Sequence, residues 1–348
     1  MGNAAVETAS RRKVWLDVLR GLPLVLVIYG HQVGGWYGYF LLTGPVKIPL
    51  FFAITGYLFN EDKSLRDFLT TLFWRLLVPW VAIGLLTGAC HIVFLGDTTV
   101  RGVLMAYVRG KAAWYVPCCV VAEILWYAIR RAFRSVPATA VAAAACFAAS
   151  MLLTRRRMLN NWMVNRAMAA QVFLLVGLVY RRWLEKLPRR ALWGFAALAA
   201  YLALALLSTR LYPGSTLDAH RNRYYSIPLC MGMVASGCLA LFWLFQSFAG
   251  SAPDWLGWFG RNTLVVYLLH NASTRLPRKM LSLAGFHRSG LAQAALLLAA
   301  AVLLACAVYS LIAALIGRFA PVLAGRWRPG KKNAGAQASD ASCFGAEK

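Results

Sequence analysis

The chain has 348 residues, of which 60% are hydrophobic and only 14% are charged. A soluble domain carries roughly a quarter charged residues, so this composition, with a mean hydropathy of +0.59, excludes an ordinary soluble protein. The net charge of +25 comes from short Lys and Arg clusters between apolar runs. That pattern is typical of membrane loops and argues against a nucleic-acid-binding surface.

The apolar residues gather in runs near 20 residues long, about the length of a bilayer-spanning helix. We therefore predict an all-α, polytopic protein of the lipid bilayer with about ten transmembrane helices. The predicted spans cover 16–36, 45–60, 76–95, 112–129, 136–153, 163–180, 191–208, 226–248, 257–273 and 290–316. They define a short N-terminal segment (1–15), a membrane domain (16–320) and a basic, disordered tail (321–348). We expect no cleavable signal peptide, because the start is polar and lacks a small-residue cleavage site.

The distribution of Lys and Arg sets the orientation. With Arg11, Arg12 and Lys13 in the cytoplasm, both termini are predicted to be cytoplasmic. The bias is modest, because the loops on the opposite side are also basic. Those loops either tolerate the charge or attract an anionic or phosphate-linked substrate, and the sequence leaves both interpretations open.

The first span carries Asp17, Arg20 and His31 on one helical face, since their spacings are close to whole numbers of turns. Ionisable groups persist in hydrocarbon mainly where they face a protein interior and have a function. The helical rise places His31 about 16 Å beyond Arg20, so the two side chains cannot touch. We assign Arg20 to the cytoplasmic end, either paired with Asp17 or meeting an anionic ligand, and His31 to the outer end.

The second span, 45–60, contains Pro45, Pro49 and Gly56. Proline removes a backbone donor and disrupts helices. These residues therefore indicate a broken or re-entrant segment, which is tolerated only where protein or a cavity satisfies the backbone.

Glu123 is the only carboxylate well inside a predicted span, and two interpretations remain open. It fixes a catalytic imidazole, as carboxylates do in acyl-transfer sites, or it pairs with an interior arginine. Trp114 either stacks on a sugar or belongs to the interfacial aromatic belt. Asn161 and Arg166 are candidate sugar contacts, as is the loop from Tyr212 to Tyr225, although ordinary solvated loops explain them more simply.

All five histidines fall towards the outer side in this topology. We favour a catalytic role for His31 and His270, because a neutral imidazole takes a proton from a hydroxyl. His91 is better explained as an interfacial residue with a hydrated tip, and His220 and His287 lie in loops. No metal-ligand set, nucleotide loop or nucleophilic-serine motif is present, and the eight cysteines show no metal or disulfide spacing. No bound metal is expected.

Four segments occur in a fixed order along the chain. They are WLDVLRGLPLVLVIYGHQ (Trp15 to Gln32), KIPLFFAITGYLF (Lys47 to Phe59), FWRLLVPW (Phe73 to Trp80) and GRNTLVVYLLH (Gly260 to His270). Together they resemble the integral-membrane O-acyltransferases called acyltransferase family 3, whose hallmark is an Arg, ten residues and a His. Here those residues are Arg20 and His31. The hallmark alone is a weak signal, but the four ordered segments are a strong one.

The branch that the chain resembles most is the fucose 4-O-acetylase-like group, which acetylates sugars of glycans. This resemblance implies acyl-CoA, usually acetyl-CoA, as a cytoplasmic donor substrate and no tightly bound cofactor. It implies a carbohydrate acceptor, such as a surface polysaccharide or a glycolipid intermediate, and a place in the bacterial cytoplasmic membrane. By the same resemblance His31 is the base or acyl relay, while Arg20 and Arg75 hold the phosphates or acyl group of the donor.

The chain departs from the family pattern in two places. Leu72 stands where the family often has a first basic residue three before Arg75, and Thr55 replaces the usual Ser. No esterase-like domain follows, so the chemistry is expected in the membrane part. Two alternatives stay open: a glycan or metabolite transporter, which predicts inverted repeats, and a noncatalytic component of polysaccharide assembly, which tolerates His31→Ala.

Overall fold

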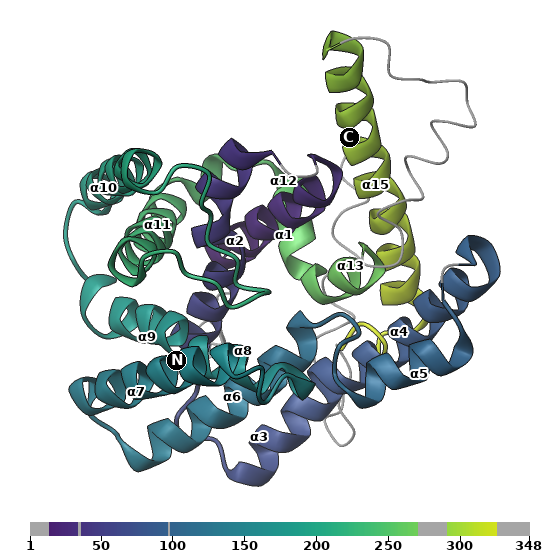
Figure 1. Cartoon of the computed structure of the whole chain (residues 1–348), viewed down its shortest axis with the longest axis horizontal. Coiled ribbons are helices and arrows are strands. Elements are labelled where there is room, and N and C mark those ends of the chain that lie inside the picture. Colours follow the sequence, from purple (N-terminus) through teal and green to yellow (C-terminus); the bar gives the residue numbers. More distant parts are fainter. Residues whose placement is uncertain (1–13, 34–35, 97, 271–290, 326–348) are drawn as a thin grey trace, which may run out of the picture.

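The computed structural model describes residues 14–33, 36–96, 98–270 and 291–325, and over these ranges it is helical, as predicted (Figure 1). The α-helices are α1 (Val14–Val33), α2 (Tyr37–Leu58), α3 (Leu65–Leu72), α4 (Val78–Cys90), α5 (Val100–Val108), α6 (Tyr115–Ala132), α7 (Val136–Arg155), α8 (Val164–Ala169), α9 (Gln171–Val179), α10 (Arg190–Leu211), α11 (Ile227–Phe248), α12 (Asp254–Arg261), α13 (Thr263–His270) and α15 (Leu291–Phe319). Short π-helical or 3-10 turns adjoin them: η1 (Phe73–Leu77), η2 (His91–Leu95), η3 (Asn161–Met163), η4 (Tyr180–Leu184) and η5 (Ala249–Ser251). The N-terminal basic cluster, His287 and the tail beyond residue 325 lie outside the described residues.

Seven helices in the described ranges are long and apolar enough to cross a membrane, or eight if one bent pair forms a single span. The seven are Val14–His31, Tyr37–Leu58, Leu65–Val93, Val136–Arg155, Arg190–Leu211, Ile227–Phe248 and Val302–Phe319. The bent pair, Asn161–Ala169 with Gln171–Leu184, meets at 43°. The chain is therefore a polytopic helical membrane protein.

Two predicted spans have no such helix within the described part of the chain. The span 112–129 falls on α6, which carries Glu123, Arg130 and Arg131. The span 257–273 falls on α12 and α13, which have only eight residues each. The total of ten spans and the cytoplasmic termini thus stay predictions.

Burial divides the helices into a central group and a peripheral group. In α2, 72% of the most apolar window is buried, whereas the values for α7 and α10 are 22% and that for α15 is 17%. Outward residues such as Val141, Leu206 and Leu311 are more than 60% exposed. Figure 1 shows α1 and α2 in the middle of the bundle, with α10 and α15 on opposite sides. Because broad apolar faces are stable against lipid rather than water, the peripheral helices are those that meet the bilayer.

The prediction of a broken or re-entrant second span is wrong. α2 is one continuous helix that begins at Tyr37 and contains both Pro45 and Pro49. Most of its residues are buried among other helices, and the Tyr201 hydroxyl of α10 donates to the Leu42 carbonyl at 2.5 Å, one turn before Pro45. Burial among neighbouring helices thus accompanies a helix that stays continuous through both prolines, as is seen in other membrane helices.

Glycines bring α12 against α1 with backbone contact. An ideal Cβ on Gly260 would lie 1.6 Å from the Asp17 carbonyl oxygen, and one on Gly21 would lie 2.1 Å from the Leu256 carbonyl oxygen. Small residues allow such approach between membrane helices. Since α12 leads directly into α13, this contact fixes the end of α13, and with it His270, relative to α1.

Candidate active site

A cavity of about 370 Å³ lies between α1, α2, α13 and the loop before α11. We call it the imidazole cavity. Its polar and aromatic lining consists of His31, Phe40, Lys47, Trp114, Thr216, Asp218, His220, Tyr267 and His270. Two predicted catalytic histidines and the predicted sugar contact Trp114, which are far apart in the sequence, therefore share one cavity.

The rings of His31 and His270 lie side by side, with centroids 5.1 Å apart and planes inclined by 45°. His270 is only 2% exposed, and its Nδ1 donates to the Tyr267 carbonyl one turn earlier. A carbonyl only accepts, so the proton sits on Nδ1 and Nε2 carries the lone pair. His31 is the more exposed of the two. The pair thus combines an accessible imidazole with a buried, oriented one.

A short loop forms the opposite wall of the imidazole cavity. Asp218 and Arg223 exchange backbone hydrogen bonds of 3.1 and 2.9 Å, and Asn222 donates from its side chain to Ser150 and Thr154 of α7 at 2.7 Å. This anchoring presents His220, whose ring centroid lies 4.8 Å from that of Trp114. The loop therefore lines the cavity with part of its length, while other residues in it, such as Tyr212 and Arg223, are exposed as in an ordinary solvated loop.

The burial of His220 favours its neutral form. Partial burial lowers the pKa of His220 below its ordinary value, and the Arg166 and Arg221 charges lower it further, while Asp218 opposes them. A neutral imidazole offers both a donor and an acceptor nitrogen to a ligand.

Arg166 and Asn161 do not line the imidazole cavity. The Nε of Arg166 donates to the His220 carbonyl at 2.6 Å, and its Nη1 donates to Asn160 and Asn165. Arg166 thus anchors the backbone of the loop without lining the cavity, and Asn161 is exposed in η3. Direct sugar contact by these two residues stays an untested prediction.

A second cavity, of about 290 Å³, opens beside the other end of α1. We call it the arginine cavity, because Arg20, Arg75 and Arg261 line it together with Glu123 and Thr55. Arg20 also lies 3.9 Å from Asp17, one turn earlier. As expected from the helical rise, Arg20 and His31 serve different cavities.

Glu123 lies with the arginines and not with the imidazoles. The Nη2 of Arg75 donates to both of its carboxylate oxygens, at 2.5 and 2.6 Å. The side chain of Glu123 is 10% exposed and that of Arg75 is 44% exposed. Of the two interpretations, this geometry matches the ion pair with an arginine. Arg75 projects from the π-helical turn η1, a distortion that is frequent at functional sites.

Tyr267 lines both cavities. Its side chain is 6% exposed, its ring centroid lies 4.9 Å from that of His270, and its hydroxyl accepts from the Tyr115 backbone N–H at 3.4 Å. Tyr115 itself lines the arginine cavity. The phenol ring of Tyr267 thus lines both the arginine cavity and the imidazole cavity.

Comparison with known proteins agrees with this arrangement. The family model of the acyltransferase domain matches residues 13–310. The chain belongs to this acyltransferase family. The match includes all four sequence segments that resemble acyltransferase family 3, and membership implies acyltransferase activity. No curated protein and no solved structure matches the chain.

Some of the residues that line the two cavities of the acyltransferase were missed by the sequence analysis. Lys47, Arg261 and Tyr267 all fall within the quoted segments but were given no role. Lys47 carries a signal that was overlooked, because it is a charge inside an apolar run, as Arg20 is.

Among the described residues, no group of three or more His, Cys, Asp or Glu is placed to hold a metal.

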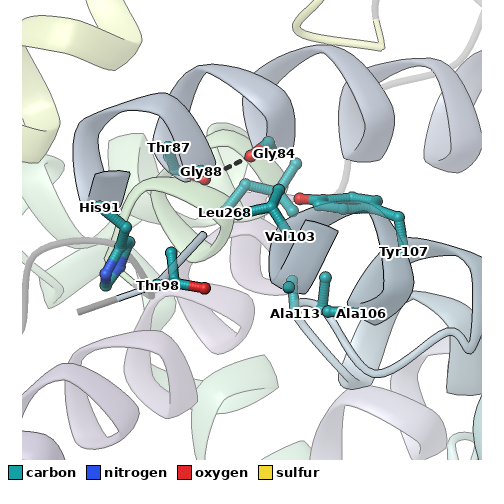
Figure 2. A pocket seen from close by; sticks show the side chains of 12 residues that line it. Gly84, Thr87, Gly88, His91, Thr98, Val103, Ala106, Tyr107, Ala113 and Leu268 are labelled. Atoms are coloured by element: carbon teal, nitrogen blue, oxygen red, sulfur yellow. Dashed lines mark hydrogen bonds between the residues drawn. The ribbon is translucent and has the colours of Figure 1, made fainter. Parts of the chain in front are cut away.

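Another cavity of the acyltransferase, of about 280 Å³, lies between α4 and α5 (Figure 2). Figure 2 shows His91 at one end of its lining and Tyr107 at the other, with the Thr87 hydroxyl donating to the Gly84 carbonyl at 2.9 Å. His91 does not line the imidazole cavity. Its separate position makes His91 a suitable control for the other histidines.

Proposed function

We propose that this acyltransferase moves an acetyl or similar acyl group from cytoplasmic acyl-CoA to a sugar hydroxyl of a surface or secreted glycan, in the bacterial cytoplasmic membrane. The observation that carries the proposal is the pairing of His31 with His270 in a cavity that shares Tyr267 with a cavity of arginines. A base and an anion-binding site are the two parts that such a transfer needs.

The donor belongs in the arginine cavity. Coenzyme A carries phosphates, and the planar guanidinium groups of Arg20, Arg75 and Arg261 suit phosphate oxygens. Glu123 holds Arg75 in place. The flexible pantetheine arm is long enough to carry the thioester towards Tyr267 and the imidazoles.

The acceptor belongs in the imidazole cavity, where His31 takes the proton of the sugar hydroxyl. The hydroxyl oxygen bonds to the thioester carbonyl carbon, the carbon–sulfur bond breaks, and the proton passes to the departing thiolate as free thiol. His270 offers the Nε2 lone pair to the neighbouring imidazole and so stabilises its orientation. Trp114 gives the sugar an aromatic surface.

Deletion and complementation test the proposal. The gene is deleted and restored as wild type, His31→Ala or the control His91→Ala, with equal amounts in the membrane fraction, and O-acetyl groups on surface glycans are measured by mass spectrometry. We expect acetylation with wild type and His91→Ala only. If glycan acetylation survives deletion of the gene, the proposed transferase activity is contradicted. If His31→Ala restores acetylation, the protein acts as a noncatalytic component of glycan assembly.

A further inference from the structure

Lys47 places an ammonium group in the wall of the imidazole cavity. It lies in the middle of α2, the most buried of the membrane helices. Its Nζ is 4.4 Å from the centroid of the Phe40 ring and 5.3 Å from that of the Tyr39 ring. Among the described residues, no side chain forms a hydrogen bond or close ion pair with it, although the Asp218 carboxylate across the cavity attracts its charge. A half-buried ammonium without a close counter-ion is costly unless a ligand supplies one.

The carboxylate in the lining of this cavity is already engaged. Asp218 lies 3.7 Å from the Nε of Arg221 and also accepts the backbone N–H of Arg221 at 3.0 Å. The histidines of the cavity can only add positive charge, and Arg166 lies directly behind His220. Lys47 therefore faces a space whose surroundings favour an anion.

A purely structural role explains Lys47 poorly. A lysine that stabilises a fold pairs with a carboxylate, and a lysine that escapes lipid extends its stem to the membrane surface. Lys47 forms no contact ion pair with Asp218, which is paired with Arg221 instead, and its side chain lines the cavity that His31 and Trp114 also line. Its aromatic neighbours hold the ammonium through cation–π contacts without neutralising it.

We infer that the acceptor is an anionic sugar, whose carboxylate or phosphate group binds Lys47 while a hydroxyl of the same residue or its neighbour meets His31. This inference rests on the proposed acyltransferase function and adds the charge of the acceptor. The cavity volume of about 370 Å³ lies in the range of small-molecule sites. The acyl-transfer step is unchanged, because the anion is bound and does not react.

Matched glycosides test the inference on the full-length protein in lipid nanodiscs. The probes are p-nitrophenyl β-glucoside, the corresponding glucuronide and the glucoside 6-phosphate, with the same sets in the galacto and manno series. Binding is measured by calorimetry, and acetyl transfer from acetyl-CoA is measured by mass spectrometry. The variants are Lys47→Met, Lys47→Arg and the control Lys111→Met, an exposed lysine outside the cavity.

We expect wild type and Lys111→Met to prefer one anionic form over the neutral glycoside by about tenfold or more, equal to about 1.4 kcal/mol. Lys47→Met brings this ratio close to one, because it weakens binding of the anionic glycoside far more than binding of the neutral one, whereas Lys47→Arg keeps the preference. The favoured anion, carboxylate or phosphate, identifies the acceptor group. Equal binding of charged and neutral members in every series overturns the inference, as does equal weakening of both by Lys47→Met.

The two proposals fail in different ways. If acetyl is transferred but charge has no effect, the anionic acceptor is wrong and the acyltransferase function stands. If anionic glycosides bind through Lys47 but acetyl-CoA is never turned over, the donor assignment is wrong and the anion site stands.

Discussion

At the residue scale, the proposed chemistry depends on His31 and His270. Removing a general base costs about 10²- to 10⁴-fold in rate, so we expect His31→Ala to lower kcat by that amount with little change in the KM for acyl-CoA. The measurement is acetyl transfer by the purified protein, with His91→Ala as the control. A similar loss in His91→Ala would point to a general effect on folding.

The role of His270 can be separated from a structural one by a double variant. If His270 acts by orienting His31, the double variant His31→Ala/His270→Ala loses no more activity than His31→Ala alone, because residues that act as a unit are not additive. Independent contributions would instead multiply. Circular dichroism and thermal unfolding of each variant show whether the fold is retained.

A substitution of Arg75 tests the proposed binding of the acyl-CoA donor in the arginine cavity. A charge-assisted hydrogen bond is worth about 1.5–3 kcal/mol, so we expect Arg75→Gln to raise the KM for acyl-CoA by about tenfold or more. The matched control is Arg182→Gln, since Arg182 is 50% exposed and pairs with Glu61 outside the arginine cavity. A loss confined to kcat, with the KM unchanged, would contradict a phosphate-binding role.

At the element scale, the contact between α1 and α12 sets the distance between the two histidines. A Cβ on Gly260 would lie 1.6 Å from the Asp17 carbonyl oxygen, whereas one on Gly250 in η5 would meet nothing within 4 Å beyond its chain neighbours. Overpacking costs about 1–3 kcal/mol or more. We expect Gly260→Ala to lower the melting temperature by several degrees and to lose activity, and Gly250→Ala to do neither. Wild-type activity in Gly260→Ala would show that α12 can move without cost to the site.

Hydropathy predicted most membrane helices but not how their prolines are accommodated. Runs such as 136–153 and 226–248 correspond closely to α7 and α11, because lipid-facing helices are apolar along their whole length. For α2 the local rule of proline failed, since the helix is held among residues distant in the sequence, such as Tyr201, which donates to the Leu42 carbonyl. Such tertiary contacts are not visible in one sequence.

Individual residues of the candidate site could be predicted from the sequence, but the contacts between them could not. An ionisable group in an apolar run indicated His31, Arg20 and Glu123 individually. The partners His270 and Arg75 come from distant helices, and their juxtaposition follows from backbone packing at residues such as Gly260. The same signal was present at Lys47 and received no weight.

At the scale of the whole molecule, buried central helices carry the site and peripheral helices meet the lipid. Both cavities border α1, and Tyr267 of α13 stands between them. In the proposed reaction, this arrangement would keep the anionic part of the donor apart from the acceptor and bring only the acyl end to the imidazoles. A wall between the two substrates also limits attack by water on the thioester, because water is excluded where the ring fills the space.

Tyr267 therefore has a predicted effect on the coupling of the two half-sites. Tyr267→Ala joins the cavities, so we expect acetyl-CoA to be hydrolysed faster without an acceptor while transfer to the glycan falls. Tyr267→Phe keeps the ring and loses only the contact with the Tyr115 backbone, so it should keep transfer and show low hydrolysis. Free thiol release with and without acceptor gives the ratio of transfer to hydrolysis for each variant. Because His31 remains in both, a fall in transfer without any rise in hydrolysis would mean that Tyr267 positions the acceptor or supports the fold and does not separate the two substrates.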